Sequence, residues 1–273
     1  MSLQGKVVLI TGASRGVGAA VAVACARAGA KVALAAKTLL PHARLPGTLG
    51  DTQRMVEEAG SEALIVPCDV RSEEQVQHMV DATVAHFGRL DALVNNAGAI
   101  FWSPVADWPV KKYDLVNQVN VRASFLASRA ALPHLRVNGG HILMMSPPIH
   151  PSASPGKAPY LISKIGMTML AMAIDAEEPK VAAHALWPVT GIQTAATVNH
   201  GFARPSDMRQ PEILADATVA LISQDPAECG FKAWLDEEVL ADRGITDLDA
   251  YNVVPGSTPS PMSIQLVDPS WKR

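Results

Sequence analysis

Charged residues are scarce in this 273-residue sequence, and there is no excess of either sign that would mark a charged binding surface. Lys and Arg number 23 and Asp and Glu number 26, so 18% of residues are charged and the net charge is −3. Typical globular chains have about 25% charged residues. Basic runs are absent, which excludes a nucleic-acid-binding surface. The apolar content of 48% excludes an intrinsically disordered chain.

Cysteines and long apolar runs are also lacking. Cys25, Cys68 and Cys229 are widely spaced and match no zinc-binding or disulfide spacing, which favours a reducing compartment. We therefore expect a cytoplasmic protein without a metal site. A membrane helix needs about 20 mostly apolar residues, whereas the longest uncharged run, Val181 to Ala203, contains Pro188 and several polar residues. The N-terminus has no charged-then-apolar leader, so we expect neither a membrane span nor a secretory signal.

Short apolar runs alternate with segments of helical spacing along the chain. The runs predict strands at Lys6–Ile10, Lys31–Ala36, Glu62–Pro67, Leu90–Val94, His141–Met145, Val181–Trp187 and Phe231–Leu235. The helical patterns cover Gly18–Ala28, Ser72–Phe87, Lys111–Leu132, Tyr160–Ala176 and Glu212–Ser223. Strands without in/out alternation that are separated by helices indicate a parallel sheet covered on both faces. The predicted fold class is α/β, a Rossmann-type doubly wound sheet of about seven strands.

We find no linker that divides the chain, so residues 1–273 are expected to form a single dinucleotide-binding domain. Its tail, from about Ala250, carries Pro255, Pro259 and Pro261 and is predicted to be irregular. Whether this tail covers a neighbour or is partly loose is left open by the sequence.

A glycine-rich loop, Thr11 to Gly18, connects the first predicted strand to the first helix. Its three glycines suit a tight turn, a close approach of backbone to a pyrophosphate and close packing of helix on strand. The helix N-terminus then offers unpaired N–H groups to phosphate. The residues predicted to bind a dinucleotide here are Gly12, Ser14, Arg15, Gly16, Val17 and Gly18. The alternative is an ordinary glycine-rich turn without a ligand.

The second predicted strand ends in Ala35-Ala36-Lys37 and has no carboxylate at its end. An Asp or Glu at this place accepts the 2′-hydroxyl of NAD, whereas a basic group favours the 2′-phosphate of NADP. Lys37 and Arg15 are two cations that can converge on this point, which favours NADP and makes NAD the less favoured cofactor. The alternative is that Lys37 is only a solvated strand end.

Tyr160 and Lys164 are four residues apart in a predicted helix and therefore share one of its faces. A nearby ammonium stabilises phenolate, so we expect Lys164 to lower the pKa of Tyr160 from about 10 toward neutrality. Tyr160 is then a candidate general acid/base for a carbonyl or alcohol oxygen. The alternative is a solvated helix pair without chemistry.

Polar residues follow the neighbouring strands at the same predicted edge of the sheet. Ser146 comes directly after strand His141–Met145, where its hydroxyl could hold a substrate oxygen or simply end the strand before Pro147-Pro148. Asn95-Asn96-Ala97-Gly98 follows Leu90–Val94; the amides can pin strand ends, while Ala97 and Gly98 leave room for adenosine. Asn120, in the next helix, could hold a water that links Lys164 to solvent.

Taken together and in this order, the motifs Thr11–Gly18, Asn95–Gly98, Asn120, Ser146, Tyr160 and Lys164 resemble the short-chain dehydrogenase/reductase family. The resemblance spans about residues 5 to 235. It implies a Rossmann fold, a nicotinamide cofactor, a catalytic tetrad of Asn120, Ser146, Tyr160 and Lys164, and a homo-oligomer, either dimer or tetramer. It also implies that Lys164 holds the nicotinamide ribose and that Asp69, with Val70 beside it, contacts the adenine. Ile192 and Thr194 would meet the nicotinamide carboxamide.

Further motifs are similar to one subgroup of that family, hydroxysteroid dehydrogenase-like protein 2 and its bacterial relatives. They are Lys37-Thr38, Pro41-His42, Leu45-Pro46-Gly47-Thr48, Ser146-Pro147-Pro148, Leu186-Trp187-Pro188 and Leu235–Leu240. The sterol-carrier domain of some relatives is not part of this sequence. Two departures from the family pattern are Pro188-Val189 in place of Pro-Gly and a shortened segment, Ala176–Lys180.

The resulting expectation is an NADP(H)-dependent oxidoreductase that interconverts a carbonyl and an alcohol. In reduction, Ser146 and Tyr160 would bind the carbonyl oxygen and Tyr160 would deliver the proton. Phe101, Trp102, Trp108 and the segment Thr194–Met208 are candidates for an apolar substrate pocket, compatible with a steroid, a fatty acyl compound or a small ketone. Two alternatives remain open: a non-redox enzyme on the same fold, and an NADP-binding regulatory or scaffold protein with little turnover.

Overall fold

A parallel sheet of seven strands forms the centre of the computed structural model, which describes residues 1–41, 46–147, 156–200 and 203–261. The strands are β1 (Val7–Thr11), β2 (Lys31–Ala36), β3 (Ala63–Pro67), β4 (Ala92–Asn95), β5 (Gly140–Met145), β6 (Val181–Trp187) and β9 (Ala233–Leu235). Their order is β3-β2-β1-β4-β5-β6-β9, and every neighbouring pair is parallel. The predicted Rossmann-type sheet is confirmed.

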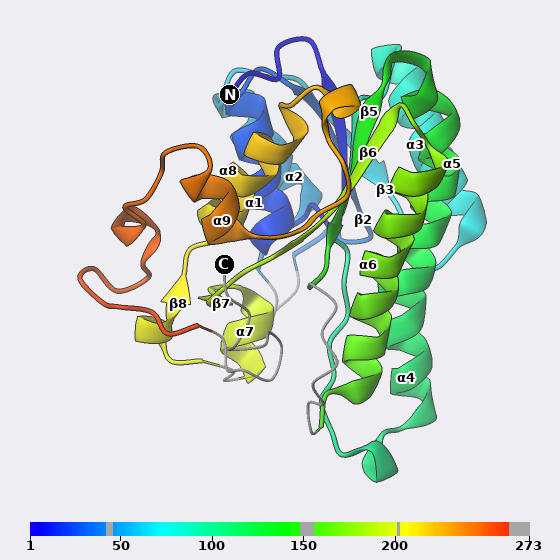
Figure 1. Cartoon of the computed structure of the whole chain (residues 1–273). Helices are drawn as coiled ribbons and strands as arrows, with labels where there is room; N and C mark the ends of the chain where they lie inside the picture. The colour runs from blue at the N-terminus through cyan, green and yellow to red at the C-terminus, as the bar shows by residue number, and fades with distance from the viewer. Residues whose placement is uncertain (42–45, 148–155, 201–202, 262–273) are drawn as a thin grey trace.

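Helices pack on both sides of this sheet (Figure 1). One side carries α1 (Gly16–Arg27), α2 (Leu49–Glu58), α8 (Glu212–Ile222) and α9 (Asp236–Ala241), and the other carries α3 (Glu73–Phe87), α4 (Val110–Asn117), α5 (Ala123–Asn138) and α6 (Ala158–Glu177). Within β1, Val8 and Ile10 enter the core beneath α1, whereas Val7 and Leu9 enter the core beneath α3. Both faces are therefore apolar, which explains why the strands show no alternation in sequence.

The connections differ from expectation in two places. Helix α2 was not among the predicted elements, although Thr48 and Asp51 form a reciprocal capping box at its start. The long stretch predicted at Lys111–Leu132 is α4 and α5 joined by one π-helical turn, Gln118–Arg122. Ser72 is the N-cap of α3, and its side chain accepts a hydrogen bond from the Gln75 N–H.

Smaller elements complete the described chain beyond β6. Strands β7 (Gly191–Ile192) and β8 (Met208–Arg209) pair with each other, and the short helix α7 (Ala195–His200) lies between them in sequence. After the turn Asp249–Tyr251, residues 252–261 have only the isolated bridge Asn252–Arg209. Residues 262–273 lie outside the described part, as do His42, Leu45 and Pro148 of the subgroup motifs. Within the described part, no helix combines the length and apolarity needed to cross a bilayer.

A buried histidine pair lies in the sheet between β5 and β6. The rings of His141 and His184 stack with centroids 6.1 Å apart, and both are nearly inaccessible to solvent. His141 shares a hydrogen bond with the Gln224 carbonyl, whereas neither ring nitrogen of His184 has a hydrogen-bond partner among the described residues. Burial, followed by the neighbouring His141, lowers the pKa of His184 to about 4. The His184 ring is therefore neutral in the folded protein at neutral pH.

His184 is expected to make the fold sensitive to acid. The pKa of His184 in the folded protein, about 4, is below the ordinary value of 6.5. The contribution of neutral His184 to the free energy of unfolding is therefore complete above pH 6.5 and is lost as the pH falls toward 4. This shift in pKa corresponds to about 3 kcal/mol in the free energy of unfolding. We expect His184→Leu to reduce the fall in Tm between pH 7.5 and 4.5. The control His78→Leu, at an exposed position of α3, should leave the fall unchanged. Equal acid sensitivity of wild type and His184→Leu would contradict this.

Candidate active site

Two adjoining cavities lie at the carboxyl edge of the sheet, the edge at which open parallel sheets bind ligands. The first, of about 540 Å³, follows the glycine loop and the ends of β2 and β3. The second, of about 490 Å³, lies between the start of α6, the end of β6 and α7. Residues that line both are Val17, Asn96, Gly98, Ala99, Thr194 and Ala196. The two cavities therefore form one continuous trough, suited to an extended ligand.

The glycine loop forms the floor of the first cavity. A Cβ on Gly18 would lie 2.4 Å from the Gly12 carbonyl oxygen and 2.6 Å from Asn96 Nδ2. A Cβ on Gly12, whose φ is +68°, would lie 2.9 Å from the Cα of Ala97. Since real Cβ atoms do not approach backbone so closely, only glycine fits at both positions. The loop leaves a cradle beside the N-terminus of α1, and these residues fit the pyrophosphate of a dinucleotide.

Asn96 ties the glycine loop to the end of β4. Its Nδ2 donates to the carbonyl oxygens of Thr11 (2.8 Å) and Gly12 (3.2 Å). In return, the backbone N–H groups of Asn96 and Ala97 donate to Thr11 Oγ1 at 3.1 and 3.0 Å. The expectation that an amide at this place pins strand ends is confirmed. These bonds hold the two walls of the trough in register.

Basic groups gather at the end of the trough farthest from α6. Arg15 and Lys37 both line it; Arg15 Nη2 donates to the Gly47 carbonyl at 2.9 Å, and its buried Nε has no hydrogen-bond partner in the described structure. The nearby carboxylate, Asp69, is already bound by Arg71, whose hydrogen bonds are the main reason that the pKa of Asp69 falls to about 2. The Asp69 carboxylate is therefore ionised and already hydrogen-bonded to Arg71.

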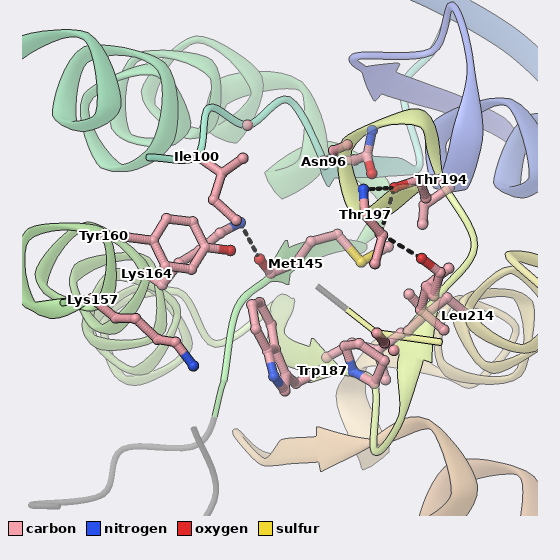
Figure 2. Close-up of a pocket in the computed structure, with 18 of the residues that line it drawn as sticks. Asn96, Ile100, Met145, Lys157, Tyr160, Lys164, Trp187, Thr194, Thr197 and Leu214 are labelled. Carbon is pink, nitrogen blue, oxygen red and sulfur yellow. Dashed lines mark hydrogen bonds between the residues drawn. The ribbon is translucent and has the colours of Figure 1, made fainter. Parts of the chain in front are cut away.

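Tyr160 and Lys164 lie together in the second cavity, as their four-residue spacing predicts (Figure 2). Lys164 Nζ donates to the Met145 carbonyl at 2.7 Å and lies 6.0 Å from the centroid of the Tyr160 ring. Burial lowers the pKa of Lys164 to about 8. Burial raises the pKa of the Tyr160 phenol above its ordinary value, so the expected net shift toward neutrality is wrong for this structure. At neutral pH the phenol is protonated and can donate its proton.

Asn120 is fully buried in the π-helical turn between α4 and α5. Its Oδ1 accepts from the Ala99 N–H at 2.8 Å, and its Nδ2 donates to the Ala99 carbonyl at 3.1 Å and to Ser163 Oγ at 2.9 Å. Ser163 in turn donates to the Tyr160 carbonyl. A Cβ on Gly98 would lie within 4 Å of both Asn120 Oδ1 and Lys164 Nζ. Asn120 therefore joins the cavity wall to α6 and lies close to the ammonium.

Ser146 is not brought into the cavity with Tyr160. It is fully buried, it does not line the cavity, and its Oγ is hydrogen-bonded to Thr168 Oγ1 at 3.0 Å. The Thr168 hydroxyl donates its one hydrogen to the Pro147 carbonyl, so Ser146 is the donor to Thr168. The Ser146–Thr168 contact thus fastens the end of β5 to α6, directly beside the carbonyl that holds Lys164.

Every residue predicted to bind the cofactor lines one of the two cavities, with Ile192 in the second and Thr194 in both. Of the predicted aromatic wall, Trp102 lines the cavity, whereas Phe101 and Trp108 stack edge to face on each other. Lining residues that the sequence patterns did not assign to the site include Ile100, Met145, Lys157, Trp187, Leu214, Ser260 and Pro261. The last two show that the described part of the tail returns to the site.

Comparisons with known proteins find dehydrogenases. The profile for short chain dehydrogenases matches residues 6–200. Hydroxysteroid dehydrogenase-like protein 2 of Xenopus tropicalis is 41% identical over 259 residues, which are 93% of this chain and 62% of that protein. The chain thus spans less than the full length of this curated relative. A crystal structure of a candidate dehydrogenase from Xanthomonas campestris is similar with a TM-score of 0.90 and 42% identity, covering 96% of this chain and 98% of that one. A short chain dehydrogenase from Mycobacterium thermoresistibile has a TM-score of 0.89 and 38% identity, covering 95% of each chain.

Proposed function

The chain belongs to the short-chain dehydrogenase family, and from that premise we propose that it is an NADP(H)-dependent oxidoreductase that interconverts a carbonyl compound and an alcohol. The observation that carries the proposal is the meeting of a glycine cradle with a buried Tyr160–Lys164 pair in one trough. When bound, the nicotinamide ring supplies or accepts the hydride.

Tyr160 exchanges the proton with the substrate oxygen in this proposal. Its phenol is buried in the cavity wall and its raised pKa keeps it protonated at neutral pH, the form required to donate to a carbonyl oxygen during reduction. Lys164 is held by the Met145 carbonyl and is cationic below its pKa of about 8, so it stabilises the phenolate that remains. Lys164 would also bind the nicotinamide ribose.

Asn120 and Ser146 support this pair from neighbouring elements. Asn120 holds Ala99 and Ser163 in place and lies close to the ammonium of Lys164, where it can position a water for the return of the proton. Ser146 keeps the β5 end, and with it the Met145 carbonyl, against α6. The remaining roles follow the lining of the trough: Asp69 and Val70 at the adenine, and Ile192 and Thr194 at the carboxamide.

The enzyme is expected to prefer NADPH over NADH, because Arg15 and Lys37 line the first cavity and would bind a 2′-phosphate, while Asp69 is bound by Arg71. Charge-assisted bonds contribute about 1.5–3 kcal/mol each. We expect Arg15→Ala with Lys37→Ala to raise the Kd of NADPH by about 100-fold and to change that of NADH by much less. Arg54→Ala, at an exposed ion pair on α2, is the control. Fluorescence titration measures both constants; an NADH preference in wild type would contradict the assignment.

Thermal-shift screening tests the proposal as a whole. A ligand that binds only the folded state raises the melting temperature, so we expect a larger shift with NADP⁺ than with NAD⁺. Carbonyl compounds that add a further shift are then assayed for consumption of NADPH. Conversion of substrate without net NADPH consumption would instead favour a non-redox enzyme on this fold. Tight NADP binding without turnover on a broad carbonyl panel would favour the regulatory alternative.

We further propose that the chain forms a homo-oligomer through α5 and α6, which lie side by side (Figure 1). Phe125, Ile162, Met169 and Met172 are large apolar side chains that these helices leave 39–57% exposed. Exposed apolar patches of this kind mark interaction sites. Phe125→Glu with Met169→Glu is expected to convert the oligomer to a monomer in light scattering, whereas Val137→Glu, at the end of α5, should not. A wild type that is monomeric would contradict the proposal.

A further inference from the structure

Lys157 is a charged side chain in the cavity for which the proposed chemistry has no use. It lies at the start of α6, lines the same 490 Å³ cavity as Tyr160, and extends along the cavity wall between Tyr160 and Trp187 (Figure 2). Its Nζ lies 4.5 Å from the centroid of the Trp102 ring. Partial burial lowers the pKa of Lys157. A cation is thus held in a partly desolvated position beside the reacting centre.

Two other charged residues of the described chain, Lys164 and Asp207, line this cavity. Lys164 is bound to the Met145 carbonyl, and Asp207 forms an ion pair with Arg204 at 2.7 Å. Most of the remaining described lining is apolar, including Ile100, Leu186, Trp187 and Leu214. A neutral apolar substrate would gain nothing from an ammonium in such a wall, and desolvation of that ammonium would weaken binding. An anionic group on the substrate would form a charge-assisted bond with it.

The spacing of Lys157 and Tyr160 limits where that anionic group lies. Lys157 is the N-cap residue of α6 and Tyr160 lies in the first turn of that helix, so both side chains are at the same end of α6 and both line the cavity. A substrate whose oxygen meets Tyr160 can therefore place a second polar group at Lys157 within a few bonds, while its apolar part fills the space toward Leu214.

We propose that the substrate is an apolar carbonyl or alcohol compound that carries a carboxylate, and that Lys157 binds this carboxylate. The inference rests on the proposed function for the reacting oxygen. It assigns Lys157 to substrate specificity and leaves proton transfer to Tyr160. In this proposal Lys157 makes the cavity prefer compounds that carry a carboxylate over neutral ketones and steroids. The apolar lining alone would bind both classes equally.

Calorimetric binding to the protein saturated with NADP⁺ tests this inference without turnover. The probes are octanoate and octanamide, which have the same length and shape and differ in charge. We expect wild type to bind octanoate about 10- to 100-fold more tightly, the range for one charge-assisted bond. Lys157→Met should remove the preference by weakening octanoate alone, and Lys157→Arg should retain most of it. Lys112→Met, which removes another lysine placed over an aromatic ring, Phe101, should behave as wild type.

Two binding results would overturn the inference. One is equal binding of octanoate and octanamide by wild type. The other is an equal loss of both ligands in Lys157→Met, which would make Lys157 a support for Trp102 and not a ligand for the substrate. Turnover is measured separately with 3-oxooctanoate and its methyl ester, in which the ketone and the carboxyl group are two carbons apart. A carboxylate preference in binding without reduction of either ketone upholds the role of Lys157 and contradicts the proposed reaction. Reduction of both at equal kcat/KM contradicts the role of Lys157 and upholds the reaction.

Discussion

Tyr160→Phe is expected to lower kcat for carbonyl reduction by about 100- to 10,000-fold, the usual contribution of a general acid. The variant removes one hydroxyl and keeps the buried ring, so the packing of Tyr160 against the cavity wall is retained. Binding of NADPH should change little, because the glycine cradle and Lys164 are untouched. Steady-state kinetics on a proven substrate, with fluorescence titration of NADPH, measures both quantities.

Two comparison variants separate this loss from a general defect. Tyr113→Phe removes the hydroxyl of a tyrosine that is 42% exposed on α4 and should leave kcat unchanged. Ser146→Ala removes a hydroxyl that faces Thr168 and does not line the cavity, so we expect its effect to be less than about tenfold, below the range for a general acid. A Tyr160→Phe enzyme with kcat near that of wild type would rule out the proton-transfer role of Tyr160.

Gly18→Ala is expected to weaken NADP(H) binding by about 10- to 100-fold and to lower Tm, since overpacking of a tight site costs about 1–3 kcal/mol. The added Cβ would lie 2.4 Å from the Gly12 carbonyl oxygen and 2.6 Å from Asn96 Nδ2. Either the loop or the Asn96 amide must then move, and both define the cradle. Helix propensity alone would predict the opposite change in Tm, because alanine within a helix is about 1 kcal/mol more favourable than glycine.

Gly230→Ala is the matched control for this substitution, because a Cβ there would meet no atom within 4 Å and its backbone is not in the left-handed region. It should leave both the Kd of NADPH and Tm unchanged. A Gly18→Ala protein that binds NADPH as tightly as wild type would show that the close approach of Gly18 to Gly12 is not what shapes the phosphate site.

The sheet could be predicted from the sequence because its strands are buried on both faces. Runs such as Val7–Thr11 and Val181–Trp187 are therefore almost uniformly apolar, and the intervening helices fix their parallel direction. The carboxyl ends of these strands meet at one edge, so residues that follow them in sequence converge in space. This explains why the predicted cofactor residues, from Gly12 to Thr194, line two adjoining cavities.

Other features depend on tertiary packing and could not be derived from spacing. The position of Ser146 after a strand does not specify that its hydroxyl faces Thr168. The pKa of Tyr160 depends on how completely the phenol is buried, which the four-residue spacing to Lys164 does not determine. Lys157 has no motif around it, and only the fold places it beside Tyr160. Helix α2 did carry a signal, the pair Thr48 and Asp51, in a glycine- and proline-rich stretch that indicates a loop.

The proposed function requires hydride transfer in this trough between a nicotinamide cofactor and a carbonyl carbon, with Tyr160 supplying the proton. The direct measurement is incubation of the wild-type protein with a carbonyl substrate and NADPH that is dideuterated at C4 of the nicotinamide ring. We expect deuterium on the carbinol carbon of the alcohol product, on one face only, and far slower formation of this product by Tyr160→Phe. Product without deuterium, or substrate conversion that leaves NADPH unconsumed, would contradict it.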